Sequence, residues 1–340
     1  MPVVNRSEKS SAERRDSSAS APQEEDRKKY KYRSSTGFDL YNSGKPIWTK
    51  EILSDFVAQI HSNTQVFFSR RMDGGFLLSL NKAFGEEPGS WHTEVFFLGF
   101  RYLLYPLKHY DDLEFAPFAI RQKDTQHPSR QPVHQVPWLR EKFDKALERW
   151  KSYEGWRTIQ VLLSNYELPP TIDKIVCFGL GNDIVSNFEA SSQHPAALNI
   201  QRFLKAKLGH DIRLLTQDPA YTSDTITVLE EHGFEVVGAE GIQGFVEVDE
   251  NTFVLSIYTS TCVKQIIADI ARPAVFITAP FHENDLDWAD EDWKVEEGRI
   301  GHPEERNVAA LIRDRWDPDT PRTKAMFEEY YDAGPWAQAE

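Results

Sequence analysis

The chain has 340 residues, 40% of them hydrophobic and 12% aromatic, which is enough apolar material for one large domain or two modest ones. Its formal net charge of −14 argues against binding nucleic acid or an anionic membrane surface, because both partners are bound by clustered Lys and Arg. The two cysteines, Cys177 and Cys262, are too few for a disulfide framework or a structural zinc site and are typical of a reducing compartment.

The location expected from these features is cytoplasmic or nuclear. The N-terminal residues lack the apolar run of a secretory signal. The most apolar stretch, residues 95–107, contains Arg101 and is too short to span a membrane, so we interpret it as buried core.

Residues 1–36 are rich in charge and serine and nearly lack apolar side chains. Ordering such a segment costs conformational entropy that burial does not offset, so we predict a disordered tail. Its basic end, residues 27–33, is either a solvated charge run or a contact for an import receptor or another anionic partner.

Residues 37–136 are predicted to form an N-terminal mixed α/β region. Thr49 is a suitable N-cap for a helix whose apolar stripe runs from Ile52 to Ile60. Short apolar runs separated by Gly and Pro follow, and the Pro-, Gln- and His-rich residues 121–137 are typical of a linker.

Residues 137–282 show a regular alternation of strands and helices after two amphipathic helices. This order predicts right-handed crossovers and a Rossmann-like α/β fold, with a mostly parallel sheet and helices on both faces. The expected strands cover residues 174–178, 211–216, 234–237, 252–257 and 274–278, and the helices between them cover residues 194–208, 223–232 and 263–270.

A glycine turn follows the first of these strands and is the principal candidate site. Ligands of such sheets bind beyond the carboxyl ends of the strands, where main-chain amides can meet a carboxylate or phosphate. The dinucleotide pattern G-x-G-x-x-G is incomplete, since Ile184 stands at the third glycine position. The turn therefore either binds a small molecule or needs its glycines only for its shape. Its residues are Gly179, Leu180, Gly181, Asn182 and Asp183.

Asp218, at the end of the second strand, is the second candidate. An acid at this place commonly accepts hydrogen bonds from ribose hydroxyls, but it can equally cap the turn and the following helix, with Pro219 stiffening the chain. Asp183 has the same two interpretations, ligand contact or N-cap. Tyr221 and Tyr258 follow the second and fourth strands and complete the candidate ligand-binding set.

These motifs resemble the Sensitivity to Red Light Reduced-like (SRR-like) domain. The resemblance is carried by KIVCFGLGN (residues 174–182), AALNIQRFLKAKLG (196–209) and QDPAYTSDTITVLEEHGFEVV (217–237), and it covers roughly residues 150–280. The added N-terminal region resembles the arrangement of fungal members. The resemblance implies regulation in light or circadian signalling, heme metabolism or microtubule-related processes, without an established reaction.

The chain departs from that family at one motif. Many members carry Pro-His-Cys after the fourth strand, where this chain has Tyr-Thr-Ser-Thr-Cys ending at Cys262. The histidine is missing, so the resemblance does not imply a His/Cys pair that ligates heme or a metal here.

No catalytic constellation and no metal site is predicted. Ser260 and Cys262 follow a strand without a G-x-S-x-G elbow or a local histidine base. His127, His134 and His282 lack metal-ligand spacing.

Residues 283–340 form an acidic, aromatic C-terminal segment. It either docks onto the domain or a basic protein partner, or it remains a solvated tail.

We expect a regulatory protein that senses a small ligand or joins a signalling complex. The cofactor is unknown, with a nucleotide-like ligand or heme compatible with the turn. One alternative is an enzyme that uses S-adenosylmethionine or NAD(P) in the same pocket. The other is a non-catalytic interaction scaffold.

Overall fold

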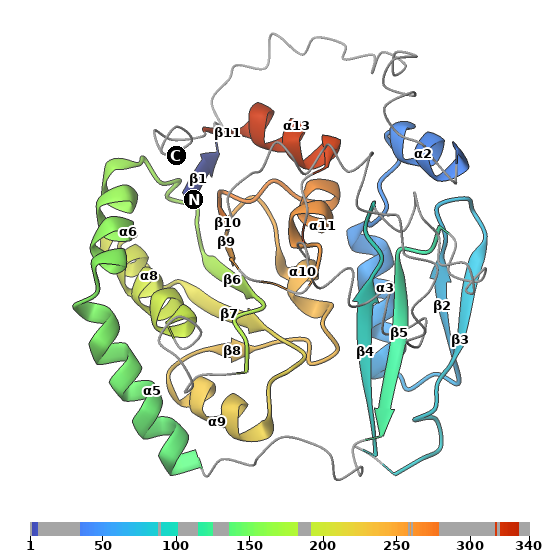
Figure 1. Cartoon of the computed structure of the whole chain (residues 1–340), viewed down its shortest axis with the longest axis horizontal. Helices are drawn as coiled ribbons and strands as arrows, with labels where there is room; N and C mark the ends of the chain where they lie inside the picture. Colours follow the sequence, from blue (N-terminus) through green and yellow to red (C-terminus); the bar gives the residue numbers. More distant parts are fainter. Residues whose placement is uncertain are drawn as a thin grey trace, which may run out of the picture.

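The structure is a computed structural model that describes residues 2–5, 35–87, 90–100, 115–124, 136–182, 192–257, 259, 261–278, 317 and 320–332. Its centre is a sheet with helices on both faces (Figure 1). None of the helices in these ranges is both long and apolar enough to span a membrane.

Five parallel strands form the core of the sheet and confirm the predicted Rossmann-like α/β fold. They are β6 (Lys174–Phe178), β7 (Arg213–Gln217), β8 (Glu235–Val236), β9 (Thr252–Ser256) and β10 (Val275–Thr278). Their order is β10-β9-β6-β7-β8, and every residue of β6, β9 and β10 is buried. Burial on both faces explains their continuous apolar sequences.

Two antiparallel strands extend this sheet beyond β10, which the sequence analysis did not predict. β1 (Pro2–Asn5) pairs with β10, and β11 (Tyr331–Asp332) pairs with β1. The prediction of a disordered tail is therefore wrong for residues 2–5. Val3 and Val4 are β-branched and suit a strand, but only pairing with a distant edge makes them one.

One face of the sheet is covered by four helices, seen on the left in Figure 1. They are α5 (Val136–Lys151), α6 (Glu154–Asn165), α8 (Gln193–Leu208) and α9 (Ser223–Glu231). The apolar stripe of α5 is buried in the same cluster as Ile175 and Cys177 of β6. α8 ends as predicted at Gly209, whose φ of 78° is left-handed.

The opposite face packs against α10 (Gln243–Glu247), α11 (Val263–Ile270) and α13 (Pro321–Tyr330). α10 was not predicted, because five residues are too few for a helical period to be visible. The part of the C-terminal segment that the structure describes docks onto the chain itself. Thr320 accepts a hydrogen bond from the Tyr41 hydroxyl at 2.9 Å, and Arg322 pairs with Asp269 at 2.9 Å.

The N-terminal region contains α2 (Ser35–Asn42), α3 (Lys50–His61), β2 (Val66–Arg70), β3 (Phe76–Leu80), β4 (Trp91–Phe97) and β5 (Phe118–Asp124). Thr49 caps α3 as predicted, by accepting the Ile52 N–H at 3.1 Å. β2–β3 and β4–β5 are separate antiparallel pairs.

This region shares one apolar core with the sheet. The ring of Phe97 on β4 lies 5.0 Å from that of Phe245 on α10, and the Val95 N–H donates to the Glu240 carbonyl at 2.8 Å. The division at residues 136 and 137 stays a prediction, but the region before it contributes directly to the surroundings of the candidate site.

Candidate functional site

The candidate site lies where the order of the parallel strands reverses. β7 and β8 follow on one side of β6, and β9 and β10 follow on the other. The connections that leave β6 and β9 therefore lead to helices on opposite faces of the sheet, α8 and α11, and ligands of such folds bind at this point of the carboxyl edge.

Two features of this edge require a glycine at residue 179, the first residue after β6. Its φ of +65° is left-handed, and a Cβ there would lie 2.9 Å from the Cα of Thr259, in the loop after β9. Its N–H donates to the Gln217 carbonyl at 3.1 Å. Glycine thus lets the loops after β6 and β9 touch.

Gly181 is bound by Asp218 across the loops. Its φ is +82°, and its N–H donates to Asp218 Oδ2 at 2.8 Å. Asp218 Oδ1 accepts the Ala220 N–H at 2.9 Å, so the carboxylate holds the turn after β7, while Thr222 is the N-cap of α9. Contrary to expectation, the amides of both glycines donate within the protein and are not turned toward an anionic ligand.

Burial raises the pKa of the Asp218 carboxyl above its ordinary value. The two backbone N–H bonds oppose that shift, and the charge of Glu94 adds to it. Asp218 is thus a partly desolvated acceptor at the edge of the sheet.

The remaining predicted residues have different environments. Leu180 is buried, and Asn182 Oδ1 accepts the Thr222 N–H at 3.0 Å. Pro219 packs against Gly241, and a Cβ added to Gly241 would lie 2.9 Å from Pro219 Cγ. Asp183 and Tyr258 lie outside the described residues.

Tyr221 belongs to a buried polar chain that sequence reasoning missed. Its hydroxyl lies 2.7 Å from Thr216 Oγ1 and 2.9 Å from His194 Nε2. His194 is fully buried in the first turn of α8, and burial lowers its pKa to about 3. Its Nδ1 has no hydrogen-bond partner within the described part of the chain. A single histidine before Pro195 gives no sequence signal for this role.

Gln217, also missed, fixes the loop after β8. Its Nε2 donates to the Gly241 carbonyl at 2.8 Å, and its Oε1 accepts the Gly244 N–H at 2.6 Å. The same loop carries Glu240, which is 7% exposed. Among the described residues, Glu240 Oε1 has no hydrogen-bond partner.

The end of β9 contributes a further acceptor. Ser256 is buried, and no described residue forms a hydrogen bond with its Oγ. Burial raises the pKa of both the Cys177 and Cys262 thiols, so neither is activated as a thiolate nucleophile.

Metal-ligating and nucleophilic candidates are otherwise few in the ranges described. No group of three or more His, Cys, Asp or Glu there could hold a metal ion. Ser260, His127, His134 and His282 lie outside those ranges.

The residues that follow or end the strands at this edge therefore include the carboxylates of Asp218 and Glu240, the hydroxyl of Ser256, and two glycine amides that are already bonded. Ionised carboxylates only accept hydrogen bonds, so Asp218 and Glu240 suit groups that donate them, such as hydroxyl or ammonium groups, better than they suit phosphate.

A family model described as SRR1 domain matches residues 143–311. The matched range begins within α5 and includes the whole parallel sheet and the glycine turn. No curated protein and no solved structure matches the chain at a significant level.

Proposed function

The chain belongs to the SRR1 domain family, and from this we propose that it is a regulatory protein whose domain binds a small ligand between the ends of β6 and β9. One observation carries the proposal: strand order reverses at β6, and the loop after β6 is linked there to the carboxylate of Asp218. A cytoplasmic or nuclear location belongs to the same proposal, in keeping with the two free cysteines.

The chemistry of the ligand follows from the groups at this edge. Asp218 retains lone pairs beside the two that accept backbone N–H groups. A ligand with vicinal hydroxyls, such as a nucleoside, would place its donors there. A diphosphate would instead meet Asp218 and Glu94, whose charges repel it.

The same observation favours one enzyme alternative over another. S-adenosylmethionine carries ribose hydroxyls and cationic groups but no phosphate, whereas NAD(P) requires a free amide cradle for its pyrophosphate. Because the amides of Gly179 and Gly181 donate within the protein, the enzyme candidate we retain is one that uses S-adenosylmethionine.

Thermal unfolding of the full chain tests ligand binding. The probes are adenosine, S-adenosylmethionine, NAD, NADP, heme and inorganic phosphate. We expect adenosine or S-adenosylmethionine to raise the Tm. A ligand at a hundredfold excess over its Kd stabilises by about 2.7 kcal/mol, which corresponds to a shift of several degrees.

The matched variants are Asp218→Asn and Asp211→Asn, each compared with its own ligand-free Tm. Asp211 is a fully exposed acid just before β7, at the end of that strand remote from the site. We expect the first variant to lose the shift and the second to keep it. A shift caused by phosphate, or one retained in Asp218→Asn, would contradict the proposal, and no shift from any probe would favour the scaffold.

Regulation and catalysis are separated by the fate of the bound ligand. Mass spectrometry after incubation with the protein and a cell lysate would recover an unchanged ligand from a sensor. Conversion of S-adenosylmethionine to its demethylated product, above that in lysate alone, would establish the enzyme.

A further inference from the structure

The β2–β3 hairpin presents an apolar face to solvent. The strands pair with Phe68 opposite Leu78, Val66 opposite Leu80 and Arg70 opposite Phe76, so all six side chains lie on one face. On that face Phe68, Phe76, Leu78 and Leu80 are between 54% and 76% exposed. The opposite face is buried and contacts α3, where the ring of Phe56 lies 5.5 Å from that of Phe67.

The size of this face points to a protein partner. Phe84 is also exposed in the turn after β3, and the five large side chains together expose on the order of 500 Å². That is near the upper end for a monomer's largest apolar patch, about 300–600 Å². A standard interface buries about 800 Å² on each partner, and these five side chains alone would contribute on the order of 500 Å² of it.

One edge of the hairpin is occupied by a side chain of α3. Gln59 on α3 donates to the Phe68 carbonyl at 3.0 Å and accepts the Phe68 N–H at 2.7 Å. The side chain of Gln59 thereby occupies the edge of β2 at that residue. The exposed face, and not that edge, is therefore the surface available for docking.

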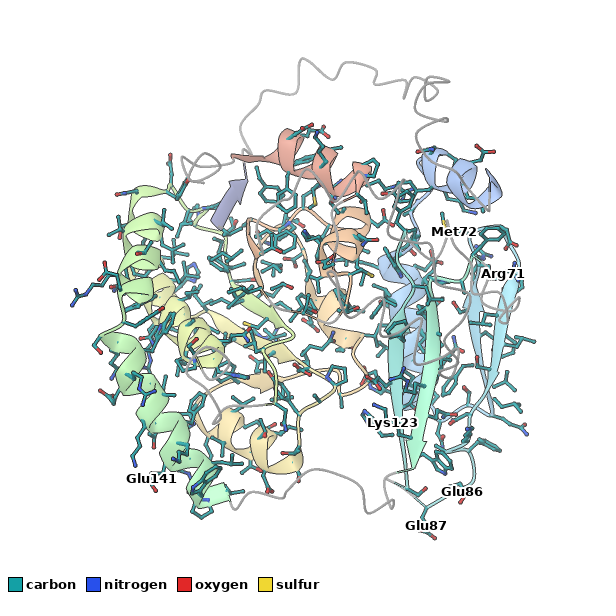
Figure 2. The ribbon with its side chains drawn as sticks, in the orientation of Figure 1. Arg71, Met72, Glu86, Glu87, Lys123 and Glu141 are labelled. Carbon is teal, nitrogen blue, oxygen red and sulfur yellow. The ribbon has the colours of Figure 1, made fainter. Side chains whose placement is uncertain are left out.

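An arginine lies at one end of the face and two glutamates lie beyond the other, where Lys82 is also exposed and its Nζ lies 5.5 Å from the centre of the Trp91 ring. Arg70, which is exposed, lies on the apolar face beside the turn that joins the strands. Glu86 and Glu87 are exposed beyond the other end of β3. Figure 2 shows Arg71 at one end of the hairpin and the two glutamates at the other. Arg71 pairs with Asp73 at 2.7 Å, whereas Arg70 lies on the exposed face of the hairpin.

We propose that this face is the interface of a homodimer in which the hairpins of two copies pack face to face. A two-fold axis perpendicular to the strands brings the Arg70 end of each hairpin over the Leu80 end of the other, which leads to the segment that carries Glu86 and Glu87. An axis parallel to the strands would bring like charges together. At the centre of the face, Phe68 and Leu78 of one copy would pack against the same two residues of the other copy. Neither residue carries a charge that would oppose this contact.

Sedimentation velocity of the full chain over a range of concentrations tests this proposal. We expect a monomer–dimer equilibrium that Leu80→Lys weakens on the order of a hundredfold, because a two-fold interface loses two leucines and gains two desolvated charges. Leu80 is 76% exposed, so we expect its replacement to change the stability of the fold little. The matched control is Val161→Lys on α6, where Val161 is 58% exposed on the far side of the sheet.

Charge reversal tests the direction of the axis. Arg70→Glu and the pair Glu86→Arg with Glu87→Arg should each weaken the dimer, and the triple variant should restore it. A chain that stays monomeric at its highest soluble concentration would overturn the proposal and leave the face to a different protein. A dimer that is insensitive to Leu80→Lys would overturn it as well.

Discussion

Asp218 accepts the Gly181 N–H at 2.8 Å and thereby joins the loops after β6 and β7. The same carboxylate accepts the Ala220 N–H at 2.9 Å. A residue expected to be either a ligand contact or a cap of its own turn is thus a link between two neighbouring loops. Any ligand at this edge would use acceptor positions that these two bonds leave open.

Titration of Asp218 should make the folded protein less stable as pH rises. Its pKa is raised in the folded state from an ordinary value of 3.8, so the folded state holds the proton more tightly than the unfolded state. This contribution to stability is present below the ordinary pKa and is lost as pH rises through the folded pKa. We expect Asp218→Asn to lack that loss in urea unfolding measured at a series of pH values.

The Asp218→Asn comparison needs a control for the lost hydrogen bond. The amide nitrogen of Asn cannot accept an N–H, so the variant should also be destabilised by about 1–3 kcal/mol at every pH. Asp211→Asn removes a fully exposed acid and should preserve the wild-type dependence. Equal pH profiles for wild type and Asp218→Asn would contradict the assignment.

His194 should produce the opposite dependence. Burial lowers its pKa to about 3, so its neutral form is favoured by folding, and this stability is present above the ordinary pKa of 6.5. It is lost as pH falls from about 6.5 toward 3. We expect His194→Phe, which can pack with Phe143 and Phe234, to lack this loss.

At pH about 4, the lowered pKa of His194 should reduce the free energy of unfolding of the wild-type protein by on the order of a few kcal/mol, as measured by urea unfolding. Tyr221→Phe removes the hydroxyl that bonds His194 but keeps the histidine. It should lower stability by about 1 kcal/mol and retain the acid sensitivity. Acid sensitivity that persists in His194→Phe would show that another group is responsible.

Gly179→Ala should destabilise the fold more than Gly209→Ala. Both glycines have left-handed φ, so both substitutions cost roughly 1–2 kcal/mol of backbone strain. A Cβ at residue 209 meets nothing within 4 Å, whereas at residue 179 it would lie 2.9 Å from the Thr259 backbone. Chemical denaturation of the two variants measures the difference, and equal losses would mean that the loops do not touch in solution.

The parallel sheet was predictable because each strand is a continuous apolar run between helices. The predicted strands agree with β6, β7, β9 and β10 within two residues at each end, and the helix at residues 263–270 agrees exactly with α11 in its bounds. Such local patterns suffice when a strand is buried on both faces. They also locate the glycine turn, because its place follows directly from the strand before it.

The rest depended on contacts between distant residues. The pairing of β1 with β10 joins residues 2–4 to residues 275–277, and no local signal marks it. The acceptor role of Asp218 toward Gly181 depends on β6 and β7 being neighbours, which strand order alone decides. His194 lies in the predicted helix at residues 194–208, but its burial and its bond to Tyr221 arise only from packing.

Arg322 fastens the C-terminal helix α13 to the body of the protein. It pairs with the buried carboxylate of Asp269 at 2.9 Å and donates to the carbonyls of Tyr41 and Lys45. Asp269 in turn accepts the Ile47 N–H at 2.6 Å. One guanidinium therefore connects α13, α11, the last turn of α2 and the chain that follows it.

Arg322→Ala should release α13, because it leaves Asp269 buried without its cation. Loss of one partner from a buried pair costs about 3–5 kcal/mol, and release of α13 would relieve that cost by exposing Asp269 to water. We expect fast hydrogen exchange in residues 321–330, while β6 and β9 remain protected. Lys324→Ala is the matched control, since Lys324 is half exposed and lies 3.8 Å from Glu328 on the same helix. If residues 321–330 exchanged as slowly in Arg322→Ala as in Lys324→Ala, α13 would be held by its apolar contacts through Met326 and Phe327 instead.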